Sequence, residues 1–151
     1  MRYLGLDLGS KTLGIAISDP SNTIASVLKT LRFSDEDYQS LIEPLKEIVN
    51  ENKIQQIVLG YPLNMNGTVG MRAEICLNFK KMLEEQLDVS VVMEDERLTS
   101  VISNQILIQA DLSRKKRKKK VDGLAAQIIL QSYLDRKGGI KKWKIKMFFK
   151  F

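Results

Sequence analysis

The chain has 151 residues, of which 44% are hydrophobic and 28% are charged, as expected for one globular domain with a conventional core. It has no histidine and one cysteine, which excludes Ser-His and Cys-His nucleophile pairs and a disulfide within the chain. The net charge of +6 is unevenly distributed, because residues 1–113 carry 10 Lys and Arg against 16 Asp and Glu, whereas residues 114–151 carry 14 against 2. Such a cationic cluster is typical of nucleic-acid binding, although a solvated surface is an equally common reason for it.

The sequence carries no sign of membrane insertion or export. No apolar stretch approaches the roughly 20 residues that span a bilayer, and the N-terminus lacks the basic and apolar regions of a signal peptide. We therefore expect a cytoplasmic protein without a membrane partner. Cys76 stands at helical spacing among apolar residues, which predicts a buried core thiol.

The first half of the chain predicts three strands, a helix and a fourth strand. The strands are expected at residues 2–8, 13–18 and 24–32, with a tight turn at Gly9-Ser10. The acidic segment 34–37 suits a helix N-terminus, and apolar residues follow it at helical spacing. Residues 54–59 form a short apolar run before Pro62, as in a buried parallel strand.

The second half alternates helices with one further strand. Helices are expected at residues 71–87, 99–110 and 121–133, and a strand at 89–93. Seven consecutive cations occupy residues 114–120, and their mutual repulsion predicts a mobile segment in the absence of a ligand.

This order of elements predicts an α/β fold. Three antiparallel strands followed by strands that can lie parallel to the first give a mixed five-stranded sheet with helices on both faces. We assign residues 1–137 to this domain and residues 138–151 to a C-terminal tail that alternates cations with aromatic residues. Aromatic side chains among lysines would suit stacking on unpaired bases.

Acidic residues stand at or near the carboxyl ends of two predicted strands. Asp7 lies near the end of the first strand, where an uncompensated carboxylate is costly to bury, although it could instead bond the following turn. Glu94-Asp95-Glu96 follow the fifth strand, at the edge where open α/β sheets bind ligands. Strand alternation places Glu94 and Glu96 on one face and Asp95 on the other, so two of these three acids can converge on one site.

Asp122 is the third candidate acid. It stands at the predicted start of the last helix, where helix capping is its simplest role. Ala125 and Ala126 follow one turn later, and such small residues would let the helix approach the sheet closely and bring Asp122 toward Asp7.

A site made of carboxylates without histidine or cysteine favours Mg²⁺ or Mn²⁺ over Zn²⁺. Two such ions can activate water and stabilise the leaving oxygen of a phosphodiester. Four cations flank the three acids in the sequence and could neutralise substrate phosphates or form ion pairs with the acids. They are Lys11, Arg97, Lys118 and Lys120.

Four motifs, in this order, carry a resemblance to a known family. They are Leu6-Asp7-Leu8-Gly9-Ser10-Lys11 with the hairpin Gly14-Ile15-Ala16-Ile17-Ser18-Asp19, Leu59-Gly60-Tyr61-Pro62-Leu63-Asn64-Met65-Asn66-Gly67, Asp95-Glu96-Arg97-Leu98-Thr99-Ser100, and Lys120-Val121-Asp122 with Ala125-Ala126. Together they resemble the bacterial YqgF/RuvX family from about residue 2 to about residue 136.

The resemblance implies a ribonuclease H-like fold, distant kinship to Holliday junction resolvases, and a role in maturing the 5′ end of precursor 16S ribosomal RNA. By motif position it makes Asp7, Glu96 and Asp122 the catalytic, metal-binding acids. The loop from Asn64 to Gly67 is also a family feature and a candidate for substrate contact, although Asn-Gly is equally a turn sequence. Thr12 stands where many members have arginine.

Three other functions remain open at this point. One is a Holliday junction resolvase-like endonuclease acting on branched DNA, which would need a dimer, and the sequence leaves the oligomeric state open. Another is a non-catalytic RNA-binding protein. The third is an ATPase related to actin and sugar kinases, whose phosphate-binding turn the first motif also resembles. That reading is disfavoured because those enzymes close two such domains around ATP.

Overall fold

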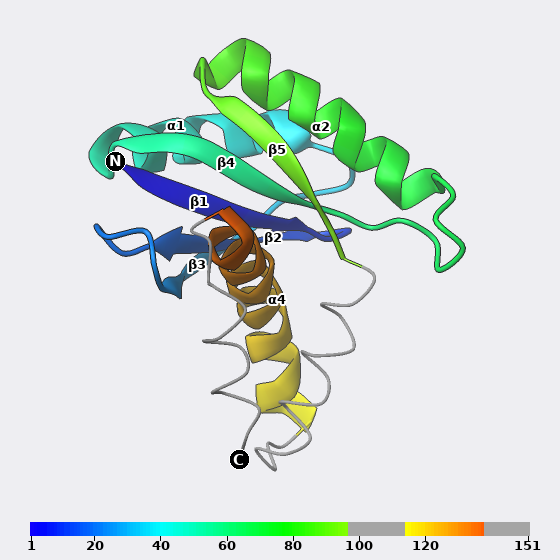
Figure 1. Cartoon of the computed structure of the whole chain (residues 1–151). Helices are drawn as coiled ribbons and strands as arrows, with labels where there is room; N and C mark the ends of the chain where they lie inside the picture. The colour runs from blue at the N-terminus through cyan, green and yellow to red at the C-terminus, as the bar shows by residue number, and fades with distance from the viewer. Residues whose placement is uncertain (97–113, 138–151) are drawn as a thin grey trace, which may run out of the picture.

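One mixed sheet organises the described part of the chain (Figure 1). The computed structural model describes residues 1–96 and 114–137, and within the second range it describes side chains from residue 123 onward. The strands are β1 (Arg2–Leu8), β2 (Thr12–Ser18), β3 (Ala25–Arg32), β4 (Ile54–Tyr61) and β5 (Ser90–Asp95). Their order across the sheet is β3-β2-β1-β4-β5, so β1 lies in the middle.

The direction of the strands brings three carboxyl ends to one edge. β1 pairs antiparallel with β2, with Leu6 opposite Ile15, and β2 pairs antiparallel with β3. β4 runs parallel to β1, with Leu59 opposite Leu6, and β5 runs parallel to β4, with Glu94 opposite Gly60. The ends of β1, β4 and β5 therefore meet at the same edge of the sheet.

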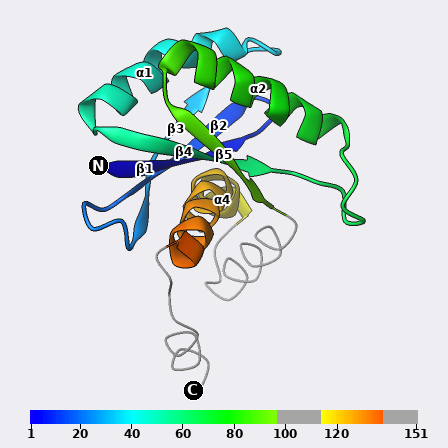
Figure 2. The ribbon, with the colours of Figure 1, turned by 45° about the horizontal axis from the view of Figure 1, so that its top comes forward.

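Helices cover both faces of the sheet (Figure 2). α1 (Ile42–Glu51), which follows the 3₁₀ turn η1 (Tyr38–Leu41), lies with α2 (Met71–Leu87) on one face. α4 (Arg114–Lys137) packs against the other face. This arrangement confirms the predicted mixed five-stranded sheet with helices on both faces.

The alternation of side chains along β1 divides the core into two layers. Leu4, Leu6 and Leu8 belong to the buried cluster on the side of α1 and α2, whereas Tyr3 belongs to the cluster that includes residues of α4. Gly5 also faces α4, because a Cβ there would lie 2.6 Å from Leu130 Cβ. By the same alternation Asp7 lies on the α4 face of the sheet.

α4 runs antiparallel to β1. The ring of Tyr3, at the start of β1, contacts the ring of Tyr133 with a centroid distance of 5.8 Å. Two residues further along β1, a Cβ at Gly5 would lie 3.0 Å from the carbonyl oxygen of Ala126. Earlier residues of α4 thus lie progressively closer to the carboxyl-terminal end of β1, with Tyr133 at its start and Ala126 further along.

Two predicted element boundaries are wrong. The acidic segment 34–37 does not begin a helix, because the 3₁₀ turn starts at Tyr38 and α1 only at Ile42. α4 begins at Arg114 and not at residue 121, so the backbone of the run 114–120 is helical. Lysine and arginine have good helix propensity. The mobility expected of this run without a ligand stays a prediction.

Two further predictions fall on residues that the structure does not describe: the helix at 99–110 and the tail at 138–151. Among the described residues, no helix combines the length and the apolar character that crossing a membrane requires.

Candidate active site

Asp7 and Glu96 meet at the edge where β1, β4 and β5 end. Asp7 is the last residue but one of β1, and Glu96 directly follows β5, where its backbone N–H donates to the carbonyl oxygen of Tyr61 at 3.1 Å. That hydrogen bond extends the pairing of β5 with β4 by one residue. The two carboxyl groups, predicted to converge from separate strands, are within hydrogen-bonding distance of each other.

The Glu96 carboxyl is strongly perturbed by this environment. Burial raises its pKa to about 9, and the negative charge of Asp7 and a hydrogen bond to Asp7 act in the same direction. The positive charge of Arg72 opposes the rise. Without a bound cation, Glu96 is therefore protonated at neutral pH and donates to Asp7, and a cation between the two carboxyl groups would replace that proton.

Gly60 of β4 makes room for the Glu96 carboxyl group. A Cβ at residue 60 would lie 2.7 Å from Glu96 Cδ, 2.9 Å from Glu96 Oε1 and 2.7 Å from Cδ1 of Ile129. All three distances are too short for a carbon atom in van der Waals contact. Gly60 belongs to the second of the four family motifs, but its steric role depends on a contact between distant parts of the chain.

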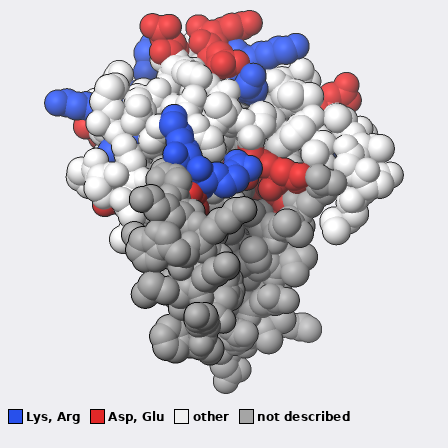
Figure 3. All heavy atoms as spheres, viewed as in Figure 1, with Lys and Arg blue, Asp and Glu red and all other residues white. Residues whose placement is uncertain are grey.

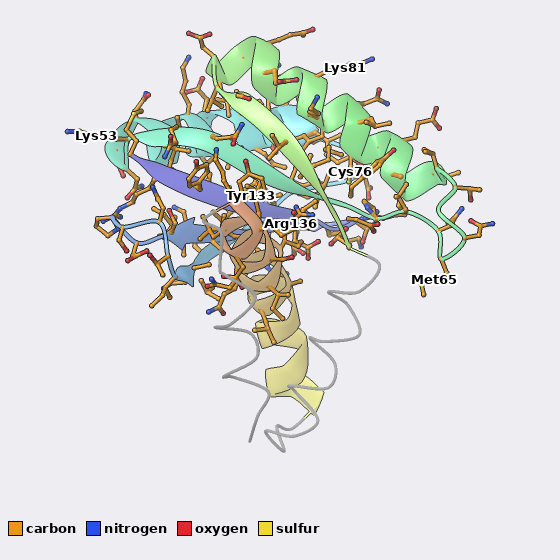
Figure 4. The ribbon with its side chains drawn as sticks, viewed as in Figure 1. Lys53, Met65, Cys76, Lys81, Tyr133 and Arg136 are labelled. Atoms are coloured by element: carbon orange, nitrogen blue, oxygen red, sulfur yellow. The ribbon has the colours of Figure 1, made fainter. Side chains whose placement is uncertain are left out.

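Glu94 has a different environment, although it shares the α4 face with Glu96 as predicted. Its residue is only 4% exposed, and its carboxylate forms an ion pair with the Arg136 guanidinium and a hydrogen bond with Ser132, both on α4 (Figure 4 labels Arg136). Burial raises its pKa, and Arg136 opposes that rise. Glu94 thus joins β5 to α4.

Asp122 lies inside α4, about two helical turns after Arg114. The interpretation of Asp122 as a helix N-cap is therefore wrong, because a cap must precede the first turn. Residue 122 stands one turn before Ala126 on the same side of the helix, and Ala126 faces Gly5 of β1. The side chain of Asp122 lies outside the described residues.

Of the four cations predicted to bind substrate, the structure describes the side chain of Lys11. Lys11 is exposed in the turn between β1 and β2, directly before β2 begins. Arg97 lies outside the described residues, and Lys118 and Lys120 belong to the first turns of α4, where only the backbone is described. Figure 3 shows acidic and basic side chains adjacent to each other on the face of the molecule that is turned toward the viewer.

Asn64 organises the loop between β4 and α2. Its N–H donates to Thr68 O at 3.0 Å, its Nδ2 donates to Thr68 Oγ1 at 2.9 Å, and its carbonyl accepts from Gly67 N–H at 2.8 Å. Gly67 has φ 84, a conformation that glycine adopts without strain. The turn interpretation of Asn-Gly is confirmed, and the loop carries the exposed Met65 at its outer side (Figure 4).

Sequence reasoning missed Arg72. It is the second residue of α2, and its Nη2 donates to the carbonyl oxygen of Leu8 at 2.8 Å. Arg72 stands one helical turn before the buried Cys76, which places it on the sheet-facing side of the helix. A cation on an otherwise apolar helix face was the signal that could have identified it.

Cys76 is the buried core thiol that the sequence predicts. Burial, together with the charges of Glu96 and Asp7, raises its pKa to about 12. The thiol therefore stays protonated at neutral pH and is neither a nucleophile nor a metal ligand in this state. Its side chain points from α2 toward the sheet (Figure 4).

The residues present fit a hard divalent cation. In the described part of the chain, no group of three or more His, Cys, Asp or Glu residues is arranged to hold a metal ion. Asp7 and Glu96 nevertheless supply two adjacent carboxyl groups that repel each other when both are ionised. Oxygen-only donors of this type suit Mg²⁺ or Mn²⁺.

Comparison with solved structures confirms the ribonuclease H-like fold. Thermus thermophilus RuvC, in a complex with a Holliday junction substrate, superposes with a TM-score of 0.58 and 13% identity, covering 91% of this chain and 96% of RuvC. The fowlpox virus Holliday junction resolvase superposes with a TM-score of 0.52 and 17% identity, covering 90% of this chain and 99% of the resolvase. At these identities the likeness concerns the fold alone.

Sequence comparison identifies the family. A relative from Geobacillus sp. (strain WCH70) is 48% identical over 137 residues, or 91% of this chain and 99% of the relative. One from Oenococcus oeni is 50% identical over 139 residues, or 91% of this chain and 96% of the relative. The names of both state pre-16S rRNA nuclease as a proposed activity. The family model described as RuvX, Holliday junction resolvase, matches residues 1–136, and the chain therefore belongs to the RuvX family.

Proposed function

We propose that this protein is a metal-dependent nuclease that processes the 5′ end of precursor 16S ribosomal RNA in the cytoplasm. The observation that carries the proposal is the contact between Asp7 and Glu96 at the carboxyl edge of the sheet. Two carboxyl groups brought together in a protein without histidine suit phosphodiester hydrolysis with divalent ions. The proposed activity named for relatives at about half identity supports RNA as the substrate.

In this proposal Asp7, Glu96 and Asp122 hold Mg²⁺ or Mn²⁺. The antiparallel course of α4 along β1 supports the third position, because residue 122 precedes Ala126 by one turn in the direction of Asp7. When bound, two such ions would lower the pKa of an attacking water and stabilise the leaving oxygen. Asp7 and Glu96 would orient the ions, because the strand that carries each acid fixes it at the same edge of the sheet.

The cations around the edge would bind the phosphates of the substrate. Lys11, Arg97, Lys118 and Lys120 are proposed for this role, with the basic first turns of α4 following the nucleic-acid backbone. Asn64 is proposed to contact substrate through the preformed turn that it closes. We propose further that residues 1–137 form the nuclease domain and that the aromatic and basic tail at 138–151 stacks on unpaired bases.

A Holliday junction resolvase is the second candidate. The family description and the name of the fowlpox virus enzyme include Holliday junction resolvase, and Thermus thermophilus RuvC is bound to a Holliday junction substrate. Branched DNA would meet the same acids and cations in this protein. A non-catalytic RNA-binding protein is the alternative in another class. The contact between Asp7 and Glu96 disfavours it, since placing two carboxyl groups together is unfavourable unless a cation or a proton neutralises them.

The test is a competition between substrates. An end-labelled precursor 16S rRNA leader and an end-labelled DNA four-way junction of similar length are mixed with the protein in Mn²⁺, in Mg²⁺ and in EDTA. We expect metal-dependent cleavage of the RNA at the 5′ side of the mature end and slower cleavage of the junction. Preferential cleavage of the junction would establish the resolvase, and binding without cleavage of either substrate would favour the RNA-binding protein.

A further inference from the structure

Arg72 reaches the end of β1 from the face of the sheet opposite to Asp7. α2 covers the Leu4, Leu6 and Leu8 side of the sheet, and Arg72 extends from its first turn to the carbonyl oxygen of Leu8, at 2.8 Å from Nη2. Leu8 directly follows Asp7 in the chain. The contact therefore joins α2 to the backbone immediately beside one of the two paired acids.

The peptide group between Leu8 and Gly9 is held at both of its polar atoms. Its carbonyl oxygen accepts from Arg72 at 2.8 Å, and its N–H, which belongs to Gly9, donates to Thr12 O at 2.8 Å. Because a peptide group is planar and rigid, fixing both atoms fixes the orientation of the whole unit. The end of β1, and with it the backbone that carries Asp7, thus has a defined position before any ligand binds.

The turn that precedes α2 packs against the start of the helix that carries Arg72. A Cβ at Gly70 would lie 3.0 Å from Asn64 Oδ1, so α2 begins in close contact with the Asn64 side chain. The N–H of Glu74 donates to Gly70 O at 3.0 Å and starts the helix there. Asn64, proposed above for substrate contact, therefore packs against the N-cap residue of α2.

The guanidinium of Arg72 is near enough to the acids to affect their electrostatics. Its positive charge opposes the burial-driven rise in the pKa of Glu96 and of Cys76, to which the charge of Asp7 adds. The bond to Leu8 uses one of the five N–H donors of an arginine. Lys81, on the same helix, is exposed and points away from the sheet (Figure 4), which makes it a matched control.

We propose that Arg72 is a positioning residue, which holds the end of β1 so that Asp7 and Glu96 stay together as a ligand pair for a divalent cation. This inference rests on the proposed function, in which these two acids bind metal. It assigns to Arg72 a role that differs from that of a phosphate-binding cation, since the side chain acts on the protein backbone and not on the substrate.

The affinity for Mn²⁺ distinguishes a positioning role of Arg72 from a purely electrostatic effect of its charge. Arg72→Ala removes a positive charge beside two carboxyl groups, so electrostatics alone would make Mn²⁺ bind more tightly. Loss of positioning has the opposite effect, and groups that orient metal ligands typically contribute about 10- to 100-fold in affinity. We therefore expect calorimetric titration with Mn²⁺ to show at least about 10-fold weaker binding by Arg72→Ala, with Lys81→Ala unchanged from wild type.

A second measurement is made on the protein without metal. Hydrogen exchange of the Gly9 amide is expected to be faster in Arg72→Ala than in wild type or Lys81→Ala, because the peptide group loses one of its two anchors. Arg72→Gln, which keeps an amide donor, replaces Arg72→Ala in both measurements if thermal melting shows that the alanine variant does not fold. Unchanged or tighter Mn²⁺ binding together with unchanged Gly9 exchange would overturn the proposal.

Cleavage kinetics provide the third measurement. Positioning predicts that kcat falls in Arg72→Ala while KM is retained, whereas a rise in KM with retained kcat would show that Arg72 contacts substrate and would contradict the proposal. If wild-type protein binds Mn²⁺ through Asp7 but cleaves nothing, the nuclease proposal fails while the calorimetry and the Gly9 exchange still decide the role of Arg72.

Discussion

The carboxyl group of Glu96 lies directly over the Cα of Gly60, so closely that a methyl group at residue 60 would come within 2.7 Å of Glu96 Cδ. The neighbouring strand thus leaves a space that only glycine provides. Gly60→Ala is expected to displace Glu96 from Asp7 and to lower kcat by about 100-fold, the effect of a misplacement of roughly 1 Å at a reacting centre. Steady-state cleavage of the preferred substrate measures this effect.

The second close contact at Gly60 provides a control for this variant. The new methyl group would also lie 2.7 Å from Ile129 Cδ1, and Ile129→Val removes that atom. The double variant should recover stability, because overpacking costs about 1–3 kcal/mol, but it should not recover activity. Recovery of activity along with stability would show that displacement of α4, and not of Glu96, caused the loss.

Glu94 is expected to contribute to stability and not to cleavage, since Arg136 and Ser132 already bind its carboxylate. Arg136→Ala leaves a buried acceptor without its charged partner and should lower the free energy of unfolding by about 1–3 kcal/mol. Glu94→Gln keeps a polar group for Ser132 and should cost less. Urea denaturation measures both variants, and a large loss of metal-dependent cleavage in a folded Glu94→Gln protein would show that Glu94 belongs to the metal site.

Asp19 should stabilise the turn between β2 and β3 only while it is ionised. Its Oδ1 accepts from the N–H groups of Thr23 at 2.8 Å and Ile24 at 3.0 Å, and these bonds, with one from Ser21, lower its pKa from 3.8 to about 2. A lowered pKa means that the stabilisation is complete above pH 3.8 and is lost as the pH falls through about 2.

Unfolding by urea at several pH values tests this contribution of Asp19. Wild type should lose more stability than Asp19→Asn between pH 4 and about 2, because the asparagine has no proton to bind in that range. Equal losses in the two proteins would show that the hydrogen bonds at this turn do not favour the ionised carboxylate.

The helical run 114–120 should govern the salt dependence of nucleic-acid binding. Each cation placed on a phosphate releases counterions, and log K then falls with log salt by about 0.9 per contact on a duplex. Replacing the seven Lys and Arg residues of this run by Gln should flatten that slope in a filter-binding or anisotropy titration. Replacing the exposed Lys53 and Lys81 (Figure 4) should leave it unchanged, and an equal slope in both variants would show that the run makes no phosphate contacts.

Local patterns in the sequence predicted most of the fold. Apolar patterns, including the continuous run at 54–59, located the five strands. The strand-end positions of Asp7 and Glu96 were enough to predict that they converge. The start of α4 was predicted too late because hydrophobic periodicity stops at the run of cations, although lysine and arginine are good helix formers.

The contributions of Gly60 and Arg72 could not be read from the sequence. Gly60 matters because Glu96 and Ile129 approach it from β5 and α4, and Arg72 because it bonds Leu8, which lies 64 residues earlier in the chain. Both depend on how elements pack in three dimensions. A cation on an apolar helix face marks Arg72 as a candidate, but it does not identify Leu8 as its partner. The interpretation of Asp122 as a cap failed for the related reason that a helix start cannot be located inside a purely charged segment.

The most direct test of the proposed site is cleavage by Asp7→Asn. Asparagine preserves the shape of the side chain but removes the charge that a divalent cation needs, so the variant should keep the wild-type circular dichroism spectrum and lose cleavage in Mn²⁺. Asp122→Asn, assayed in parallel, should lose cleavage as well. Loss of cleavage in a folded Asp7→Asn protein is the predicted result, and wild-type rates in that protein would contradict the assignment of Asp7 and Glu96 as the catalytic acids.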